Sequence, residues 1–270
     1  MLCGIIRMLA LRVMNTGSAR CYMCDKPATS HEHVPPKCIF PERKDFRGED
    51  HRSQLITVPS CDTHNSKKSK DDEFLMVSLA GIIGNNSIGY RHKFTKVNRA
   101  IRNTCGRLLD AVFLKRKHYV VKLEDNAFLE MIWGTPDYQR LEHCFDRIAR
   151  ELFCHHFGGR FQGQSRVLMG YLDNSDKNSA TFTKFIKHRA EIDLKGKERF
   201  GYNPRVFFYQ FTDHDQHGLF LLKMCFYEGA DVFVSFIPAG TVVPFNLGMK
   251  LIEGGIKSFI TLEGTSYEFN

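Results

Sequence analysis

The residues best suited to chemistry lie between positions 21 and 65, and the first of them form two pairs of metal-binding side chains. CYMC spans 21–24 and CDTH spans 61–64. A gap of two residues lets both side chains of a pair reach one tetrahedral ion, and two such pairs a few tens of residues apart are typical of a structural zinc site. The alternative is two incidental thiols and a surface histidine. We predict that Cys21, Cys24, Cys61 and His64 bind Zn²⁺ with no open coordination position.

A second polar group, SHEHVPP at 30–36, lies between the two halves of this predicted zinc site, and Asn65 follows His64 directly. The zinc would bring Glu32, His33 and Asn65 into one small module. Carboxylate and amide oxygens suit a hard cation such as Mg²⁺, and a neighbouring histidine suits a general base. This combination points to metal-assisted hydrolysis of a phosphodiester. In a strand, however, His31 and His33 would lie on one face and Glu32 on the other. His31 itself is either a helper of the catalytic residues or an exposed neighbour.

The order CxxC, EHVPP and CDTHNSKK resembles the HNH endonucleases over about residues 18–80. The resemblance implies a ββα-metal fold in its zinc-stapled, treble-clef-like form. It also implies that His33 is the general base, that Glu32 and Asn65 hold a catalytic Mg²⁺ or Mn²⁺, and that the four cysteine and histidine side chains named above are the structural zinc ligands.

The chain departs from the family pattern in two places. The first motif position, usually Asp-His, is Glu32-His33, which places a longer carboxylate at the metal. The middle Asn of the pattern is not evident, and Ser53 or Gln54 lies near its expected position. The second departure bears on activity more than on fold.

Three lysines follow the second metal pair closely and are candidates for nucleic-acid contact. Lys67, Lys68 and Lys70 would lie on the first turns of the helix, where they could bind phosphate or simply be solvated. Asp71 and Asp72 come next and would repel phosphate, so we expect a one-sided contact surface.

Composition and charge favour a soluble globular protein with an anionic partner. The chain has 270 residues and a formal net charge of +8, and residues 1–100 carry 16 Lys and Arg against 10 Asp and Glu. Such an excess suits DNA, with RNA not excluded, although a merely basic surface is the alternative. Most of the nine cysteines are scattered singly, which favours reduced thiols and hence a cytoplasmic location. No run is long enough to span a membrane.

The pattern along the chain predicts an α+β protein in two parts. Residues 1–17 read as a leader or packing helix, 18–84 as the HNH module and 90–270 as a larger α+β domain. We expect a helix from Cys61, capped by Ser60 and ending at Gly81 or Gly84, then amphipathic helices over 94–115 and 139–157. Apolar runs at 205–212, 218–227 and 231–238 predict strands.

Three further groups receive structural rather than functional interpretations. TDHDQHG at 212–218 could be a second metal cluster, but it suits a hairpin turn better. CHHF at 154–157 lies in a helical pattern and reads as buried or capping. The aromatic strands could stack on bases, yet they are more typical of sheet core.

We therefore expect a divalent-metal-dependent HNH endonuclease acting on DNA, in a role such as restriction or anti-phage defence. The domain at 90–270 would serve substrate selection, homo-oligomerisation or binding of a regulatory partner. The alternative is a zinc-stapled module that binds nucleic acid or protein without catalysis.

Overall fold

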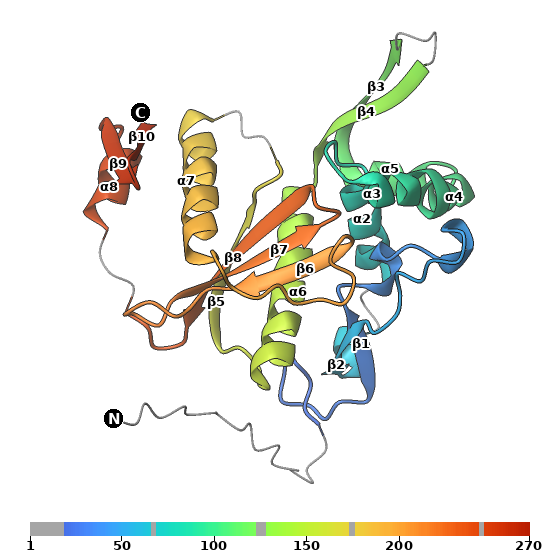
Figure 1. The fold of residues 1–270 in the computed structure, drawn as a ribbon, viewed down its shortest axis with the longest axis horizontal. Helices are drawn as coiled ribbons and strands as arrows, with labels where there is room; N and C mark the ends of the chain where they lie inside the picture. The colour runs from blue at the N-terminus through green and yellow to red at the C-terminus, as the bar shows by residue number, and fades with distance from the viewer. Residues whose placement is uncertain (1–18, 66–68, 123–127, 173–175, 243–245) are drawn as a thin grey trace, which may run out of the picture.

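The centre of the molecule is a four-stranded antiparallel sheet built from the apolar runs near the end of the chain (Figure 1). The computed structural model describes residues 19–65, 69–122, 128–172, 176–242 and 246–270, so the predicted leader at 1–17 lies outside the described residues. The sheet order is β5-β8-β7-β6. Its strands are β5 (Gly163–Met169), β6 (Phe207–Phe211), β7 (Phe220–Phe226) and β8 (Ala230–Pro238). The three predicted strands and the α+β class are confirmed.

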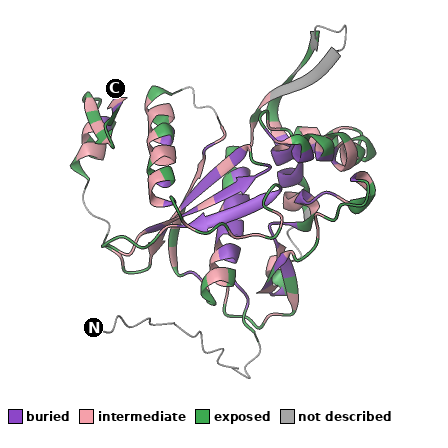
Figure 2. Ribbon diagram, in the orientation of Figure 1, coloured by how far each residue is buried: buried purple, intermediate pink, exposed green. Residues whose placement is uncertain are grey.

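The two faces of the sheet pack against different helices. Val232, Val234 and Phe236 of β8 belong to the main core, together with α6 (Tyr138–Phe157). The intervening Phe233 packs instead with Ala190 and Leu194, at the end of α7 (Lys177–Asp193). Alternate residues of a strand point to opposite faces, so α6 and α7 cover the two sides. The aromatic strands are therefore sheet core, as predicted (Figure 2).

The N-terminal part forms a hairpin followed by helices. Strand β1 (Ser30–Val34) pairs antiparallel with β2 (Ile56–Ser60), and the loop between them contains η1 (Lys37–Ile39) and η2 (Arg43–Asp45). The Val34–Pro35 peptide bond is cis. Helices α1 (Asp62–Asn65) and α2 (Ser69–Ala80) follow β2. Helix α2 ends just before Gly81, as predicted.

The predicted cap of this helix is wrong. Ser60 is the last residue of β2, and its hydroxyl donates to the carbonyl of Cys61 at 3.4 Å. The amides of His64 and Asn65 both donate to that same Cys61 carbonyl at 3.0 Å, so the helical turn starts one residue later than expected.

The single helix predicted over 94–115 is also wrong. The chain instead forms α3 (Ser87–His92), the π-helix η3 (Lys93–Val97), α4 (Asn98–Asn103) and α5 (Arg107–Val112). Cys105 (φ 50°) and Gly106 (φ 82°) take left-handed backbone conformations between α4 and α5, which no continuous helix accommodates. At Phe113 the chain enters β3 (Phe113–Lys122), which pairs antiparallel with β4 (Phe128–Pro136) as a projecting ribbon (Figure 1).

The C-terminal residues form a small unit against α7. It consists of α8 (Leu247–Glu253) and a hairpin of β9 (Ser258–Leu262) and β10 (Thr265–Phe269). Ile252, Tyr267 and Phe269 are buried there against Phe182 and Phe185 of α7.

The main core is continuous across the predicted boundary at 84–90. One cluster joins buried side chains of the hairpin, such as Val34 and Val58, to α2, α6 and the large sheet. Two polar contacts reinforce the join. Tyr227 donates its hydroxyl to the carbonyl of Ile39, and His92 donates from Nε2 to the carbonyl of Cys38 at 3.1 Å. The division into 18–84 and 90–270 stays a prediction.

Among the described residues, no helix combines the length and the apolar character that crossing a membrane requires.

Candidate functional site

The four predicted zinc ligands converge at one end of the β1–β2 hairpin. Their ligand atoms all lie within 4.8 Å of one another, and they are the one such group of metal-binding side chains among the described residues. The Sγ atoms of Cys24 and Cys61 are 3.8 Å apart, and Nδ1 of His64 lies 3.4 Å from the Sγ of Cys21 and 3.2 Å from that of Cys61. A tetrahedral zinc with its usual bond lengths separates two sulfurs by about 3.8 Å and a sulfur from a nitrogen by about 3.6 Å. The cluster could therefore hold a metal ion, and its dimensions are compatible with structural zinc.

Local backbone geometry explains why these ligands converge. The amide of Cys21 donates to the carbonyl of Lys26 at 3.0 Å, which closes the turn that carries the first pair, and the amide of Met23 lies 3.5 Å from the Sγ of Cys21. In the second pair, Cys61 directly precedes α1 and His64 lies on it. Burial opposes ionisation of Cys61, but hydrogen bonds from the backbone and ring of His64 and from the other two thiols lower its pKa to about 6. The thiolate so favoured is the form that binds metal.

The predicted catalytic residues Glu32 and His33 face opposite sides of β1. Glu32 pairs with Val58 and His33 with Thr57, and burial alternates along the strand, so that Glu32 is 5% exposed while His31 is exposed. His31 and His33 thus share one face and Glu32 lies on the other, as the sequence predicted for a strand.

Asn65 is held against the same strand by a hydrogen bond. Its Nδ2 donates to the hydroxyl of Ser30 at 2.8 Å. Because Ser30 lies two residues before Glu32, the two share a face of β1. The structure therefore brings Asn65 to the Glu32 side of the strand and places His33 on the opposite side.

Two charged side chains of α6, those of Arg147 and Glu151, lie near Tyr22 together with Glu32, and sequence reasoning missed them. Burial, then the negative charges of Glu151 and Glu32, raise the pKa of Tyr22 well above its usual range. Arg147 is 6% exposed and adds its positive charge to this group. Arg147 and Glu151 lie four residues apart on the apolar stripe of α6, between Cys144 and Leu152. Charged residues four apart inside such a stripe are the signal that could have shown that this stretch is buried against another polar element.

The acidic residues that follow the lysines predicted to contact nucleic acid form ion pairs with α6. Asp71 accepts from Nε of Arg140 at 2.9 Å, and Asp72 pairs with Arg147 at 3.4 Å. Their charges are thereby countered, and the repulsion of phosphate expected from them is weakened. Lys70 is exposed, whereas Lys67 and Lys68 lie outside the described residues.

The remaining sequence candidates have structural roles or exposed positions. In the β6–β7 turn, Asp215 accepts from the amides of His217 and Leu219, both at 2.8 Å, as the hairpin interpretation predicted. His156 packs its ring against Phe200, with 4.7 Å between ring centroids, at the end of α6. Ser53 and Gln54, the positions nearest the missing Asn, are exposed in the turn before β2.

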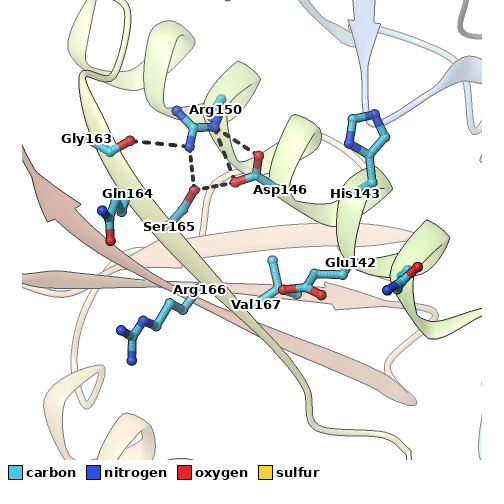
Figure 3. Close-up of a pocket in the computed structure, with 10 residues that line it drawn as sticks. Glu142, His143, Asp146, Arg150, Gly163, Gln164, Ser165, Arg166 and Val167 are labelled. Carbon is cyan, nitrogen blue, oxygen red and sulfur yellow. Dashed lines mark hydrogen bonds and ion pairs between the residues drawn. The ribbon is translucent and has the colours of Figure 1, made fainter.

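Two hollows lie away from this site. One, of about 550 Å³, lies between α6 and β5, where Arg150, Asp146 and Ser165 hydrogen bond to one another (Figure 3). The other, of about 800 Å³, lies between α7 and the sheet and is floored by apolar residues such as Phe233. In the first, three of the polar side chains that line the hollow, those of Arg150, Asp146 and Ser165, are paired with each other.

Comparisons with protein-family models, with curated proteins and with solved structures found no match to this chain.

Proposed function

We propose that the chain is a divalent-metal-dependent endonuclease of the HNH type that hydrolyses phosphodiester bonds of DNA. One observation carries the proposal: the β1–β2–α1 unit supplies a metal-ligand cluster, Glu32 and His33 on its first strand, and Asn65 on its helix. Residues 90–270 would then serve substrate selection, self-association or regulation, and restriction or anti-phage defence is the biological role we propose.

The metal cluster has a structural role in this proposal. Cys21, Cys24, Cys61 and His64 would hold Zn²⁺ with all four positions filled by protein. The ion would fasten the turn before β1 to the helix after β2, and so fix Asn65 against the strand that carries Glu32 and His33.

Glu32 and Asn65 would hold the catalytic Mg²⁺ or Mn²⁺. The Nδ2 of Asn65 is committed to Ser30, which makes its Oδ1 the atom to face the cation. The divalent cation, when bound, supplies positive charge that stabilises the developing charge on phosphate. His33 takes the proton of a water molecule whose oxygen attacks phosphorus. The bond from phosphorus to the leaving sugar oxygen then breaks, and that oxygen takes up a proton.

A second candidate function is a zinc-stapled module that binds nucleic acid or protein without catalysis. The observation that favours it is the burial of Glu32, which faces Tyr22 and α6 while His33 faces the other way. Because Glu32 and His33 do not share a face of β1, they could act on the same phosphate only at the edge of this strand.

Nicking of supercoiled plasmid in the presence of Mg²⁺ or Mn²⁺ distinguishes the two, with RNA as a parallel substrate. We expect His33→Ala to lower the rate by about 100-fold or more, the usual contribution of a general base, at unchanged zinc content. His31→Ala, on the same face, tests the helper role, and His217→Ala in the β6–β7 turn is the matched control. Equal cutting by His33→Ala and wild type would refute His33 as the base. A wild type that is inactive with every metal and substrate would favour the binding module.

A further inference from the structure

The positive charge of the chain is concentrated in one segment outside the candidate site. Residues 91–122 contain ten Lys and Arg and a single acidic residue, Asp110. The rest of the chain contains 28 Lys and Arg against 29 Asp and Glu, so it is close to neutral. The formal excess of +8 therefore resides almost wholly on the end of α3, on η3, α4 and α5, and on β3.

Part of this charge serves the fold. Arg99 pairs with Asp45 at 2.7 Å, and Lys96 lies 3.5 Å from Glu42. Arg116 pairs with Asp110 at 2.9 Å, which ties β3 to α5.

Other cations of the segment are exposed. Arg102 and Arg107 lie on and after α4, and Lys115 and Lys117 lie at the base of β3. Helix α5 contacts both α4 and β3, so the elements that carry these residues are neighbours in the fold. In the sequence, acidic residues follow at 124, 125 and 130, so the run of positive charge ends at Lys122.

The shape and the exposed rings of this region suit a nucleic acid. β3 has ten residues, which at about 3.3 Å per residue span about 33 Å, close to one turn of B-form DNA. A two-stranded ribbon also fits the major groove. Phe94 is 60% exposed and Tyr119 46% exposed among the cations, and Lys93 lies over the Phe94 ring at 6.0 Å.

We propose that residues 91–122 are the surface through which this protein binds the backbone of duplex DNA, with α4, α5 and the base of the β3–β4 ribbon on the phosphates. The proposal rests on the proposed function in its choice of DNA as the polyanion. It assigns binding to residues other than Glu32, His33 and Asn65, so binding and cleavage can be tested with separate variants.

The test measures binding of the full chain to a fluorescent DNA duplex over a range of salt concentrations, without added Mg²⁺ or Mn²⁺. The triple variant Arg102→Gln, Lys115→Gln and Lys117→Gln removes three exposed charges from the surface. Each lost phosphate contact lowers the slope of log affinity against log salt by about 0.9. We expect a slope lower by about 2 to 3 and an affinity weaker by about tenfold or more at about 0.1 M salt.

Two control variants make the result specific. The first control is a triple variant that removes the same charge from exposed positions elsewhere, Lys184→Gln, Lys195→Gln and Lys250→Gln. Its affinity for DNA should change less than about twofold, the size expected of distant surface charges. The second control is the triple variant Arg102→Lys, Lys115→Arg and Lys117→Arg. It keeps the charge of the surface and should bind DNA as wild type does. Circular dichroism and zinc content check that every variant is folded.

Several outcomes would overturn the proposal. Equal weakening by the two charge-removing triples would mean that only net charge matters. Tighter binding to duplex RNA or to anionic lipid vesicles than to duplex DNA would assign the surface to another partner. Unchanged binding by the first triple variant would refute the surface alone. By contrast, a chain that binds through these residues but never nicks plasmid would support the surface and refute the nuclease.

Discussion

Replacement of His92 tests whether the N-terminal hairpin and the rest of the chain are stabilised as one unit. Its ring is fully buried, and its Nε2 donates to the carbonyl of Cys38, just beyond β1. Burial, followed by the positive charges of Lys96 and Arg52, lowers the pKa of His92 to about 4 from its ordinary 6.5. The folded chain therefore holds this ring neutral at a pH where the unfolded chain protonates it.

The sign and size of the effect follow from proton binding. Below pH 6.5 the unfolded state takes up a proton that the folded state refuses until about pH 4. Stability from the neutral ring is thus fully present above pH 6.5 and is lost as the pH falls towards 4. At about 1.4 kcal/mol for each tenfold change in proton concentration, the loss is about 2 kcal/mol at about pH 5 and about 3 kcal/mol near pH 4.

Urea unfolding followed by circular dichroism at about pH 7.5 and about pH 5 measures this loss. The variant His92→Gln retains a donor for the Cys38 carbonyl but cannot titrate. We expect wild type to lose about 2 kcal/mol more than His92→Gln between the two conditions. The control His217→Gln, altered in the exposed β6–β7 turn, should follow wild type. Parallel losses in wild type and His92→Gln would refute the reasoning.

Three further predictions concern the metal cluster and the contacts that hold α2 and the hairpin. Cys61→Ser should release about one equivalent of zinc, because it removes one of four ligands; metal analysis of the purified variant measures this. Arg147→Met should cost about 3 to 5 kcal/mol in urea unfolding, because it removes the positive charge beside the buried Glu151 and the ion pair with Asp72. Tyr227→Phe should cost about 1 to 3 kcal/mol, because the Ile39 carbonyl loses its buried donor.

Each of these predictions has a matched control. Cys105→Ser alters an exposed thiol between α4 and α5 and should retain the zinc. Equal zinc loss by Cys105→Ser and Cys61→Ser would argue against Cys61 as a zinc ligand. Arg189→Met breaks an exposed pair with Asp193 and should cost less than about 1 kcal/mol. Tyr202→Phe alters an exposed ring, and a cost equal to that of Tyr227→Phe would contradict the buried-donor argument.

The sequence predicted those features that depend on local spacing. The metal cluster follows from two gaps of two residues, and β6, β7 and β8 follow from short apolar runs between turn residues. The helix over 94–115 failed because periodicity alone did not reveal the left-handed backbone at Cys105 and Gly106. The predicted helix also ran over Phe113, Leu114 and Lys115, the first three residues of β3, and no strand was predicted for this stretch.

The surroundings of Glu32 were beyond local reasoning. The spacing showed that Glu32 and His33 face opposite sides of a strand, but it did not show what each side contacts. That depends on Arg147 and Glu151, more than a hundred residues further along the chain, and on the packing of α6 against the hairpin. Long-range packing of this kind leaves no signal at the residue it buries.

The hydrogen bond from Tyr227 to the carbonyl of Ile39 joins residues 188 positions apart in the chain. A ribosome adds about 5 to 20 residues per second, so the loop after β1 is made roughly 10 to 40 seconds before Tyr227, which directly follows β7. Until Tyr227 is made, the Ile39 carbonyl in the loop after β1 lacks its hydrogen-bond donor. We therefore expect the N-terminal hairpin to reach its final resistance to proteases only after synthesis has passed β8, which places completion of the candidate site late in the life of the nascent chain.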